Sequence, residues 1–357
     1  MRVAIIGAGI LGANLAYALS RRGADVTVIE AAGPAAAATG HSFGWVNASF
    51  YADAAHFALR AEGIAGYRRL CKDLDLPVAW SGCLCWEQEG DALTAQAAAL
   101  VALGYEAQIV SRKDMAYMEP NVAVPERAIF FRSEAAVEPA ALTRALLAAS
   151  GARVLMGSRV AGMALQNGCV TGVCIPGGTL PVDRVIVASG IGSADLLAPL
   201  GVHLPMLHRP GVIFHTQSLP PMLSHVCVAP IGEFRQLPDG RILMPTAISH
   251  QADQSEQIAD RLDILADAAL ARLQKLLPGI ALTWQDVSLA QRPVPQDGLP
   301  VIGACGPEGL YAAVMHSGIT LAPVVAEMLA ADVMGQMSAA QAALVAPYAP
   351  VRFQQGV

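Results

Sequence analysis

Charged side chains are scarce in this sequence: they make up 15% of the 357 residues, whereas hydrophobic residues make up 54%. A chain with this balance is not disordered, and it can bury a large core. The composition is compatible with a buried sheet flanked by alanine-rich helices. The length favours two domains or one elaborated α/β domain.

Clusters of lysine and arginine are also missing, and the net charge of -6 argues against a nucleic-acid partner. The seven cysteines include no CxxC pair, so neither a disulfide framework nor a zinc or iron–sulfur site is indicated. The histidines between 203 and 225 show no metal-ligand spacing. Reduced thiols are typical of the cytoplasm. We therefore expect a cytoplasmic protein without a metal.

The apolar stretch VAIIGAGILGANLAYALS, residues 3–20, has the hydrophobicity of a signal peptide or a membrane helix. It lacks the small-residue cleavage site of the first and contains too many glycines and polar breaks for the second. Its pattern predicts a buried strand, a glycine turn and a helix that closes at Gly23, followed by a second strand, DVTVIE, that ends at Glu30. This is a complete βαβ unit, and no membrane span is expected.

The three glycines of GAGILG have separate functions in a dinucleotide-binding turn. Gly7 allows the tight turn after the strand, Gly9 lets the backbone approach a pyrophosphate, and Gly12 lets the helix pack closely on the sheet. The pyrophosphate would lie at the positive end of the helix, and Glu30 would accept hydrogen bonds from the adenosine ribose. NAD and FAD both use this motif, so the cofactor must be decided elsewhere.

Two further stretches decide between NAD and FAD. The N-terminal GAGILG…VIE, the late RPVPQDGLPVIG at 292–303 and the final HSGITLAP at 316–323 resemble the family of glycine oxidase, sarcosine oxidase and D-amino-acid oxidase. The three motifs have the order and spacing of that family, and the resemblance extends over the whole chain. It implies a two-domain FAD enzyme that oxidises a carbon–nitrogen bond of an amino acid or amine. Oxidation of an amine by a flavin means hydride transfer from the substrate carbon to flavin N5.

The resemblance also implies which residues hold the cofactor. The stretch from 157 to 201 is similar to the family's second FAD-binding segment, in which the backbone of Val160 would meet the adenine. Family members with covalent flavin carry a cysteine just before the late motif; this chain has SLAQRP there, so FAD is expected to be non-covalent. The expected cofactor residues are Gly7, Gly9, Ile10, Leu11, Gly12, Glu30, Ala31, Thr39, His41, Ser42, Gly44, Trp45, Val160, Ser189, Gly190, Arg292, Gly318, Ile319 and Thr320.

A helix that starts after Gly318 is expected to act on the flavin. The free backbone N–H groups of Ile319 and Thr320 would point toward the pyrimidine edge, where negative charge develops on reduction. Pro323 is tolerable if it lies in the first turn of this helix. An ordinary terminal helix after a glycine turn is the alternative.

Arg292 is the expected substrate residue, because it matches the arginine with which amino-acid-oxidising members of the family hold the substrate carboxylate. It could instead pair with Asp297 or cap a loop, and a carboxylate-free amine would then be the better substrate. His41 and His316 are further catalytic candidates, since both fall in segments expected near the flavin ring.

Three weaker candidates complete the set. Trp45 and Tyr311 could pack beside the flavin or have no role there. The segment IGEFRQLPDGRILM predicts a hairpin that turns at Asp239-Gly240, and Arg235 on it could face the pocket.

The predicted fold is α/β, with a Rossmann-like FAD-binding domain interleaved with an antiparallel-sheet substrate domain. The FAD-binding domain is assigned to 1–60, 140–205 and 290–357, and the substrate domain to 61–139 and 206–289. Apolar residues at helical spacing predict amphipathic helices over 54–74 and 257–277.

The function predicted from these motifs is oxidation of an amino acid or small secondary amine to an imine, which water then hydrolyses. Dioxygen or another electron acceptor would reoxidise the flavin. Two alternatives stay open: a flavoprotein subunit of a larger amino-acid dehydrogenase complex, and a flavin-binding scaffold without turnover. Substrate identity, its chirality and the oligomeric state are outside what the sequence predicts.

Overall fold

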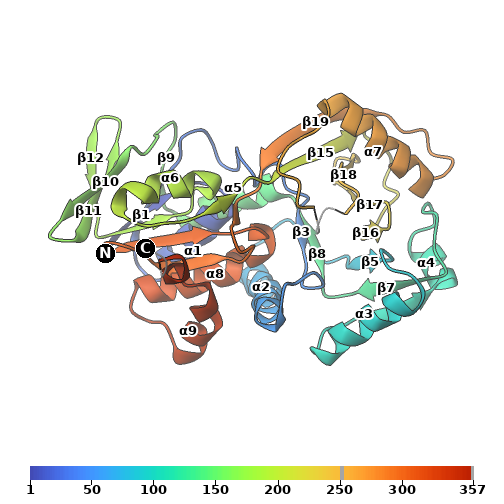
Figure 1. Ribbon diagram of the computed structural model, residues 1–357, viewed down its shortest axis with the longest axis horizontal. Coiled ribbons are helices and arrows are strands. Elements are labelled where there is room, and N and C mark those ends of the chain that lie inside the picture. The colour runs from blue at the N-terminus through green and yellow to red at the C-terminus, as the bar shows by residue number, and fades with distance from the viewer. Residues whose placement is uncertain (250–252, 355–357) are drawn as a thin grey trace.

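A six-stranded sheet forms the left half of the computed structural model, which describes residues 1–249 and 253–354 (Figure 1). All of its neighbouring strands are parallel except the antiparallel pair at one edge, β21 with β22. In spatial order the strands are β21 (Val301–Ala304), β22 (Leu310–Val314), β13 (Arg184–Val187), β1 (Arg2–Ile6), β2 (Asp25–Ile29) and β9 (Arg153–Leu155).

The two faces of this sheet are covered differently because successive side chains of a strand point to opposite sides. Val3 and Ile5 of β1 join a core with α1 (Ile10–Ser20), α5 (Pro139–Ser150) and α8 (Gly318–Val333). Ala4 and Ile6 join a second core on the other face, with α6 (Ser193–Leu197) and a three-stranded antiparallel sheet. The strands of that sheet are β10 (Gly162–Gln166), β11 (Cys169–Ile175) and β12 (Gly178–Pro181). The result is the predicted Rossmann-like layering.

An eight-stranded sheet forms the right half (Figure 1). Its neighbours are antiparallel apart from β16 and β5, which run parallel. In spatial order the strands are β19 (Trp284–Gln291), β15 (Pro210–Thr216), β18 (Ile242–Pro245), β17 (Gly232–Gln236), β16 (Val226–Ala229), β5 (Cys83–Cys85), β7 (Arg127–Phe131) and β6 (Gln108–Ser111). Helix α7 (Leu262–Leu276) packs on one end of this sheet and α3 (Gly90–Ala102) on the other.

The remaining elements are short, apart from the long helix α2 (Ala54–Asp73), which packs against α8. They are β3 (Trp45–Val46), β4 (Val78–Ala79), α4 (Arg112–Met118), β8 (Ala135–Val137), η1 (Gly190–Gly192), η2 (Ala198–Leu200), β14 (Met206–Leu207), β20 (Val294–Pro295), α9 (Ala339–Val345), η3 (Ala346–Tyr348) and η4 (Pro350–Phe353). The six-stranded sheet draws on the start, middle and end of the chain, and the domain boundaries themselves stay a prediction.

Several expected elements form with shifted ends. The helix expected to close at Gly23 ends at Ser20, and Gly23 then adopts a positive φ of 80°. The helix expected over 257–277 begins at Leu262, and the hairpin around Asp239-Gly240 forms between β17 and β18.

Pro323 does not lie in the first turn of its helix, because α8 already begins at Gly318. A proline here has no N–H to donate to the carbonyl of Ile319, four residues earlier. The Tyr67 hydroxyl of α2 donates to that carbonyl instead, at 2.6 Å. The prediction of the proline's position was therefore wrong, and a side chain from a neighbouring helix satisfies the backbone.

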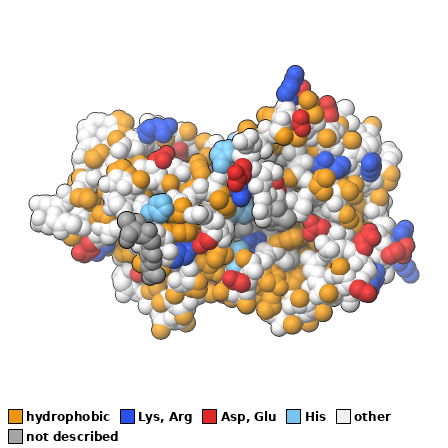
Figure 2. All heavy atoms as spheres, in the orientation of Figure 1, with side chains coloured by type: hydrophobic (Ala, Val, Ile, Leu, Met, Phe, Trp, Pro, Cys, Tyr) orange, Lys and Arg blue, Asp and Glu red, His pale blue; other side chains and the backbone are white. Residues whose placement is uncertain are grey.

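Charged side chains of both signs are scattered over the visible face of the molecule rather than separated by sign (Figure 2). Within the described residues, no helix combines enough length with enough apolar character to cross a membrane.

Candidate functional site

One cavity of about 870 Å³ collects residues from distant parts of the chain. Of the expected cofactor and catalytic residues, all but Gly12 lie on its wall, whereas the weaker candidates Tyr311 and Arg235 do not. Those on the wall are Gly7, Gly9, Ile10, Leu11, Glu30, Ala31, Thr39, His41, Ser42, Gly44, Trp45, Val160, Ser189, Gly190, Arg292, His316, Gly318, Ile319 and Thr320. Their common location is a fact of the structure, and their individual roles stay predictions.

The glycine turn after β1 leaves no room for side chains at two positions. Gly7 has a φ of 110°, and a Cβ there would lie 2.6 Å from the Ala188 carbonyl oxygen. A Cβ on Gly12 would overlap the carbonyl oxygen of Gly7. Gly12 thus lies beneath the turn, where it allows close packing of α1, and it does not line the cavity.

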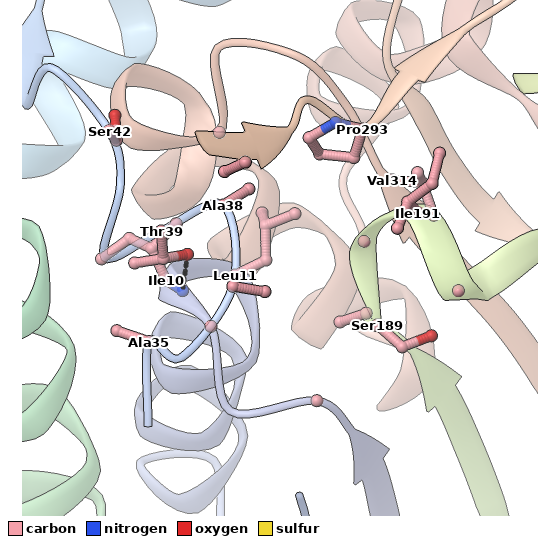
Figure 3. Close-up of a pocket in the computed structure, with 18 of the residues that line it drawn as sticks. Ile10, Leu11, Ala35, Ala38, Thr39, Ser42, Ser189, Ile191, Pro293 and Val314 are labelled. Atoms are coloured by element: carbon pink, nitrogen blue, oxygen red, sulfur yellow. Dashed lines mark hydrogen bonds between the residues drawn. The ribbon is translucent and has the colours of Figure 1, made fainter. Parts of the chain in front are cut away.

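The loop after β2 closes over the start of α1. Thr39 Oγ1 accepts the N–H of Ile10 at 3.1 Å, as the dashed line in Figure 3 shows. Leu11 is in the first helical turn, and its N–H has no acceptor among residues 1–249 and 253–354. The helix therefore presents free positive backbone dipoles to the cavity beside the loop.

Glu30 and Val160 border the cavity on the side of β2. The Glu30 carboxylate accepts the N–H groups of Ala8 and Ala32, each at 2.8 Å. Every carboxylate oxygen keeps acceptor capacity beyond one hydrogen bond, so ribose hydroxyls can still donate to it. Ser158 donates its N–H to the Glu30 carbonyl, which brings the neighbouring backbone of Val160 to the same edge.

The turn after β13 forms the opposite wall, where Figure 3 shows Ser189 and Ile191 across the cavity from Thr39. Gly190 has a φ of 60°, which a residue without Cβ adopts readily. Ser189 Oγ lies 3.1 Å from Ser193 Oγ, and this contact ties the turn to α6.

Helix α8 begins at the cavity after an abrupt turn. Ser317 has a positive φ of 56°, unusual for a residue with a side chain, and it caps the helix without a side-chain hydrogen bond. Leu321 donates the first helical hydrogen bond, to the Ser317 carbonyl at 3.1 Å. The backbone N–H groups of Gly318, Ile319 and Thr320 have no acceptor among the described residues. This helix start favours negative charge.

Arg292 lies at the cavity but already has a carboxylate partner. Its Nη2 is 2.8 Å from Asp253 Oδ2, and both side chains are largely buried. Burial lowers the pKa of Arg292, while the Asp253 carboxylate opposes that shift. The alternative partner considered for it, Asp297, pairs with Arg352 at 2.7 Å instead. Arg292 thus faces the cavity within an ion pair that sequence spacing did not indicate.

The histidines and aromatics differ in position. His41 is exposed on the cavity wall, and His316 is half-buried, with Nδ1 at 3.3 Å from Ser317 Oγ. Trp45 lies on the wall, and its Nε1 donates to buried Glu134 at 2.9 Å. Tyr311 is not among the cavity residues, which favours the alternative that it has no role beside the flavin.

Arg235 does not face the pocket, which corrects a second expectation. Its side chain is 4% exposed, and its nitrogens form hydrogen bonds and an ion pair with other residues of the protein. Nε donates to the Phe43 carbonyl, Nη2 to the Val137 carbonyl, and Nη1 pairs with Glu138 at 2.9 Å. The hairpin therefore uses this arginine to hold the loop before Trp45 in place.

Sequence reasoning missed several polar residues on the wall, among them Arg60 and Asn47. Arg60 comes from the middle of α2, where helical spacing indicated only a surface helix with one buried face, and it bonds to Asn47. Neither belongs to a motif of the resembled family that the sequence displays. A charged residue on the apolar stripe of a predicted helix, as Arg60 is, was the available signal.

The residues on the wall fit FAD. Two helix starts with free N–H groups suit a pyrophosphate and an electron-rich ring, and Glu30 suits a ribose. None of the seven cysteines, all within the described residues, lies on the wall, which favours non-covalent binding.

Comparisons with known proteins agree with this geometry. The family model "FAD dependent oxidoreductase" (DAO) matches residues 2–332. A glycine oxidase of Pseudomonas aeruginosa is 28% identical over 98% of both chains. An uncharacterized oxidoreductase of Bacillus subtilis is 28% identical over 97% of both. The solved structure of a glycine oxidase from Geobacillus kaustophilus superposes with a TM-score of 0.83 at 23% identity, covering 98% of this chain and 99% of that one.

Proposed function

Because the chain belongs to the family of FAD dependent oxidoreductases, we propose that it oxidises the carbon–nitrogen bond of an amino acid or small secondary amine to an imine. FAD supplies the chemistry when bound, since its N5 accepts a hydride from the substrate carbon. The observation that carries the proposal is the single cavity that joins the glycine turn, the start of α8 and Arg292.

In this proposal, different residues of the cavity bind different parts of FAD. The free N–H at Leu11 serves the pyrophosphate, Glu30 the ribose, and the backbone of Val160 the adenine. The start of α8 then lies at the flavin end, where N–H groups oriented in advance stabilise charge without reorganisation.

Arg292 binds the substrate carboxylate in this proposal, and Asp253 holds the guanidinium until then. The planar fork of an arginine suits a bidentate carboxylate, whether internal or from the substrate. A substrate carboxylate therefore takes the place of Asp253 on Nη2. His41 and His316 lie on the same wall and contact the substrate or tune the flavin. The imine leaves the site and is hydrolysed by water.

The test is anaerobic titration of the purified yellow protein, followed by its visible absorbance. Glycine, sarcosine, proline analogues, and D- and L-amino acids are added one at a time. Bleaching of the flavin bands by one compound identifies the substrate class. Air is then admitted: formation of hydrogen peroxide indicates an oxidase, and reoxidation only by an added dye indicates a dehydrogenase.

A protein that stays yellow with every compound would contradict the proposal. It would support the alternative that the protein is a flavin-binding scaffold, or a subunit of a larger dehydrogenase complex that lacks its partner. Arg292→Ala tests the scaffold alternative, because a scaffold tolerates that change without loss of function and an amine oxidoreductase does not.

A further inference from the structure

Arg60 places a buried positive charge on the cavity wall. The residue is 2% exposed, and it lies in the middle of α2. Its Nε donates to the Asn47 carbonyl at 3.1 Å and its Nη2 to Asn47 Oδ1 at 2.5 Å. Both acceptors are neutral. Within residues 1–249 and 253–354, Nη1 has no hydrogen-bond acceptor, and Arg60 forms no ion pair.

The other arginines of the cavity differ from Arg60 in this respect. Arg292 shares its charge with Asp253 in a close ion pair. Arg159 is exposed to solvent beside Val160, where water screens its charge. Burial lowers the pKa of Arg60 only to about 10, and the nearby Glu134 opposes the shift, so Arg60 stays protonated at neutral pH.

Arg60 is joined to the start of α8. Asn47, which accepts both of its hydrogen bonds, donates its own N–H to Thr320 Oγ1 at 3.2 Å. One turn beyond Arg60 on α2, a Cβ on Gly63 would overlap the Thr320 carbonyl oxygen, so the two helices touch there. The guanidinium and the free N–H groups of the α8 start therefore act on one region of the cavity.

Positive charge in a buried site is costly without a negative partner. Two sources of positive potential converge here. Among the described residues no carboxylate forms an ion pair with either, and Glu134 attracts Arg60 without a hydrogen bond to it. The region is therefore suited to a ligand group that carries or acquires negative charge. In the proposed function that group is the pyrimidine ring of the flavin, which becomes anionic on reduction.

We propose that Arg60 is the cation that stabilises the negative charge of the reduced flavin's pyrimidine ring, together with the first turn of α8. This inference rests on the proposed function. Arg60 supplies a full positive charge in addition to the backbone dipoles of α8, and it comes from α2, which is outside the dinucleotide motif. Because the charge is fixed by Asn47, it requires no rearrangement when the flavin is reduced.

The test uses the FAD-loaded protein and two measurements that need no amine substrate. The first is the two-electron reduction potential, measured against a redox dye. The second is the dissociation constant of sulfite, which adds through its sulfur to flavin N5 and leaves extra negative charge on the pyrimidine ring. Arg60→Met is expected to weaken the sulfite adduct at least tenfold and to lower the potential by about 30 mV, a tenfold change for a two-electron couple. Arg60→Lys is expected to retain most of both.

Arg272→Met is the matched control. Arg272 is half-buried, whereas Arg60 is fully buried. Like Arg60 it donates to backbone carbonyls, those of Ile231 and Thr246, but it is not on the cavity wall. Its replacement should change stability without moving the potential. If Arg60→Met does not fold, Arg60→Gln, which keeps donors to Asn47 but no charge, carries the test.

Three outcomes would overturn the inference. An unchanged potential with weaker binding of carboxylate inhibitors would assign Arg60 to the substrate. An unchanged potential with loss of FAD or of thermal stability would make Arg60 structural. An equal loss in Arg60→Lys and Arg60→Met would exclude charge as the cause. If the wild-type protein binds FAD and shows these effects but no amine reduces it, the proposed function fails and the inference stands.

Discussion

At the scale of single residues, the Asp253–Arg292 pair allows a test of whether the substrate carries a carboxylate. Asp253→Asn removes the internal carboxylate, so the KM of a carboxylate-bearing substrate is expected to fall about tenfold. Arg292→Met is expected to raise it about 10- to 100-fold, the range of one or two hydrogen bonds to a charged group. Steady-state kinetics measure both, with FAD content checked by absorbance.

Asp297→Asn is the control for that experiment, because Asp297 pairs with Arg352 and is not on the cavity wall. Its KM should match the wild type. A rise in KM for Asp253→Asn would show that Asp253 orients Arg292 rather than competing with substrate. No effect from either change at Arg292 or Asp253 would point to an amine without a carboxylate.

Glu134 makes the stability of the fold depend on pH. It is fully buried and accepts hydrogen bonds from Trp45 Nε1, the Ser49 N–H and the Tyr105 hydroxyl. Burial is the largest influence and raises its pKa from 4.5 to about 7, although the hydrogen bonds oppose it. Between these values the folded protein binds more protons than the unfolded chain. Its contribution is therefore full below pH 4.5 and is lost as pH rises to 7, a change of about 3 kcal/mol.

Glu134→Gln should remove this part of the pH dependence. The variant loses a constant amount of stability, because an amide accepts fewer hydrogen bonds than a carboxylate. Urea unfolding at pH 5 and pH 7.5 should therefore show a smaller deficit relative to wild type at pH 7.5. An equal deficit at both values would mean that Glu134 titrates at its ordinary pKa.

Side-chain pairing limits what sequence predicts at this scale. The roles of Gly7 and Gly12 follow from local backbone geometry, and the structure shows the close contacts that their motif requires. The bond of Arg60 to Asn47 and the pair of Arg292 with Asp253 join residues that only the tertiary fold brings together. No spacing rule encodes such contacts.

At the scale of elements, the contact of α2 with α8 can be tested through Tyr67. Its hydroxyl supplies the donor that Pro323 denies to the Ile319 carbonyl. Tyr67→Phe leaves that buried carbonyl without a partner and is expected to cost about 1–3 kcal/mol of unfolding free energy, measured by urea denaturation. Tyr117→Phe, at a position 89% exposed, should cost nothing measurable.

A double-mutant cycle isolates this hydrogen bond. Pro323→Ala restores an N–H to the helix at position 323, so the Ile319 carbonyl gains a backbone donor. Tyr67→Phe should then cost clearly less in the Pro323→Ala protein than in the wild type. Equal costs in the two backgrounds would show that Tyr67 acts through ring packing alone.

Element types followed well from hydrophobic periodicity, whereas element ends did not. Helix α2 matches its predicted range almost completely, since its buried face repeats at helical spacing throughout. Helix α7 begins later than predicted, because the residues before Leu262 continue the apolar pattern without joining the helix. Pro323 was expected in the first turn of α8 but lies beyond it, and the sequence pattern does not show the tyrosine of another helix that compensates for it.

At the scale of the whole molecule, the cavity depends on segments from most of the chain, so FAD should stabilise the entire fold. Ligands that bind only the native state add RT ln(1 + [L]/Kd), about 4 kcal/mol at a thousandfold excess over Kd. The melting temperature should therefore rise by several degrees with FAD concentration. ADP, which carries the ribose, adenine and pyrophosphate, should give part of that rise, because Leu11, Glu30 and Val160 alone serve it. FMN, which lacks the adenosine half, should give less. A larger shift with FMN than with ADP would mean that the glycine turn is not the main anchor of the cofactor.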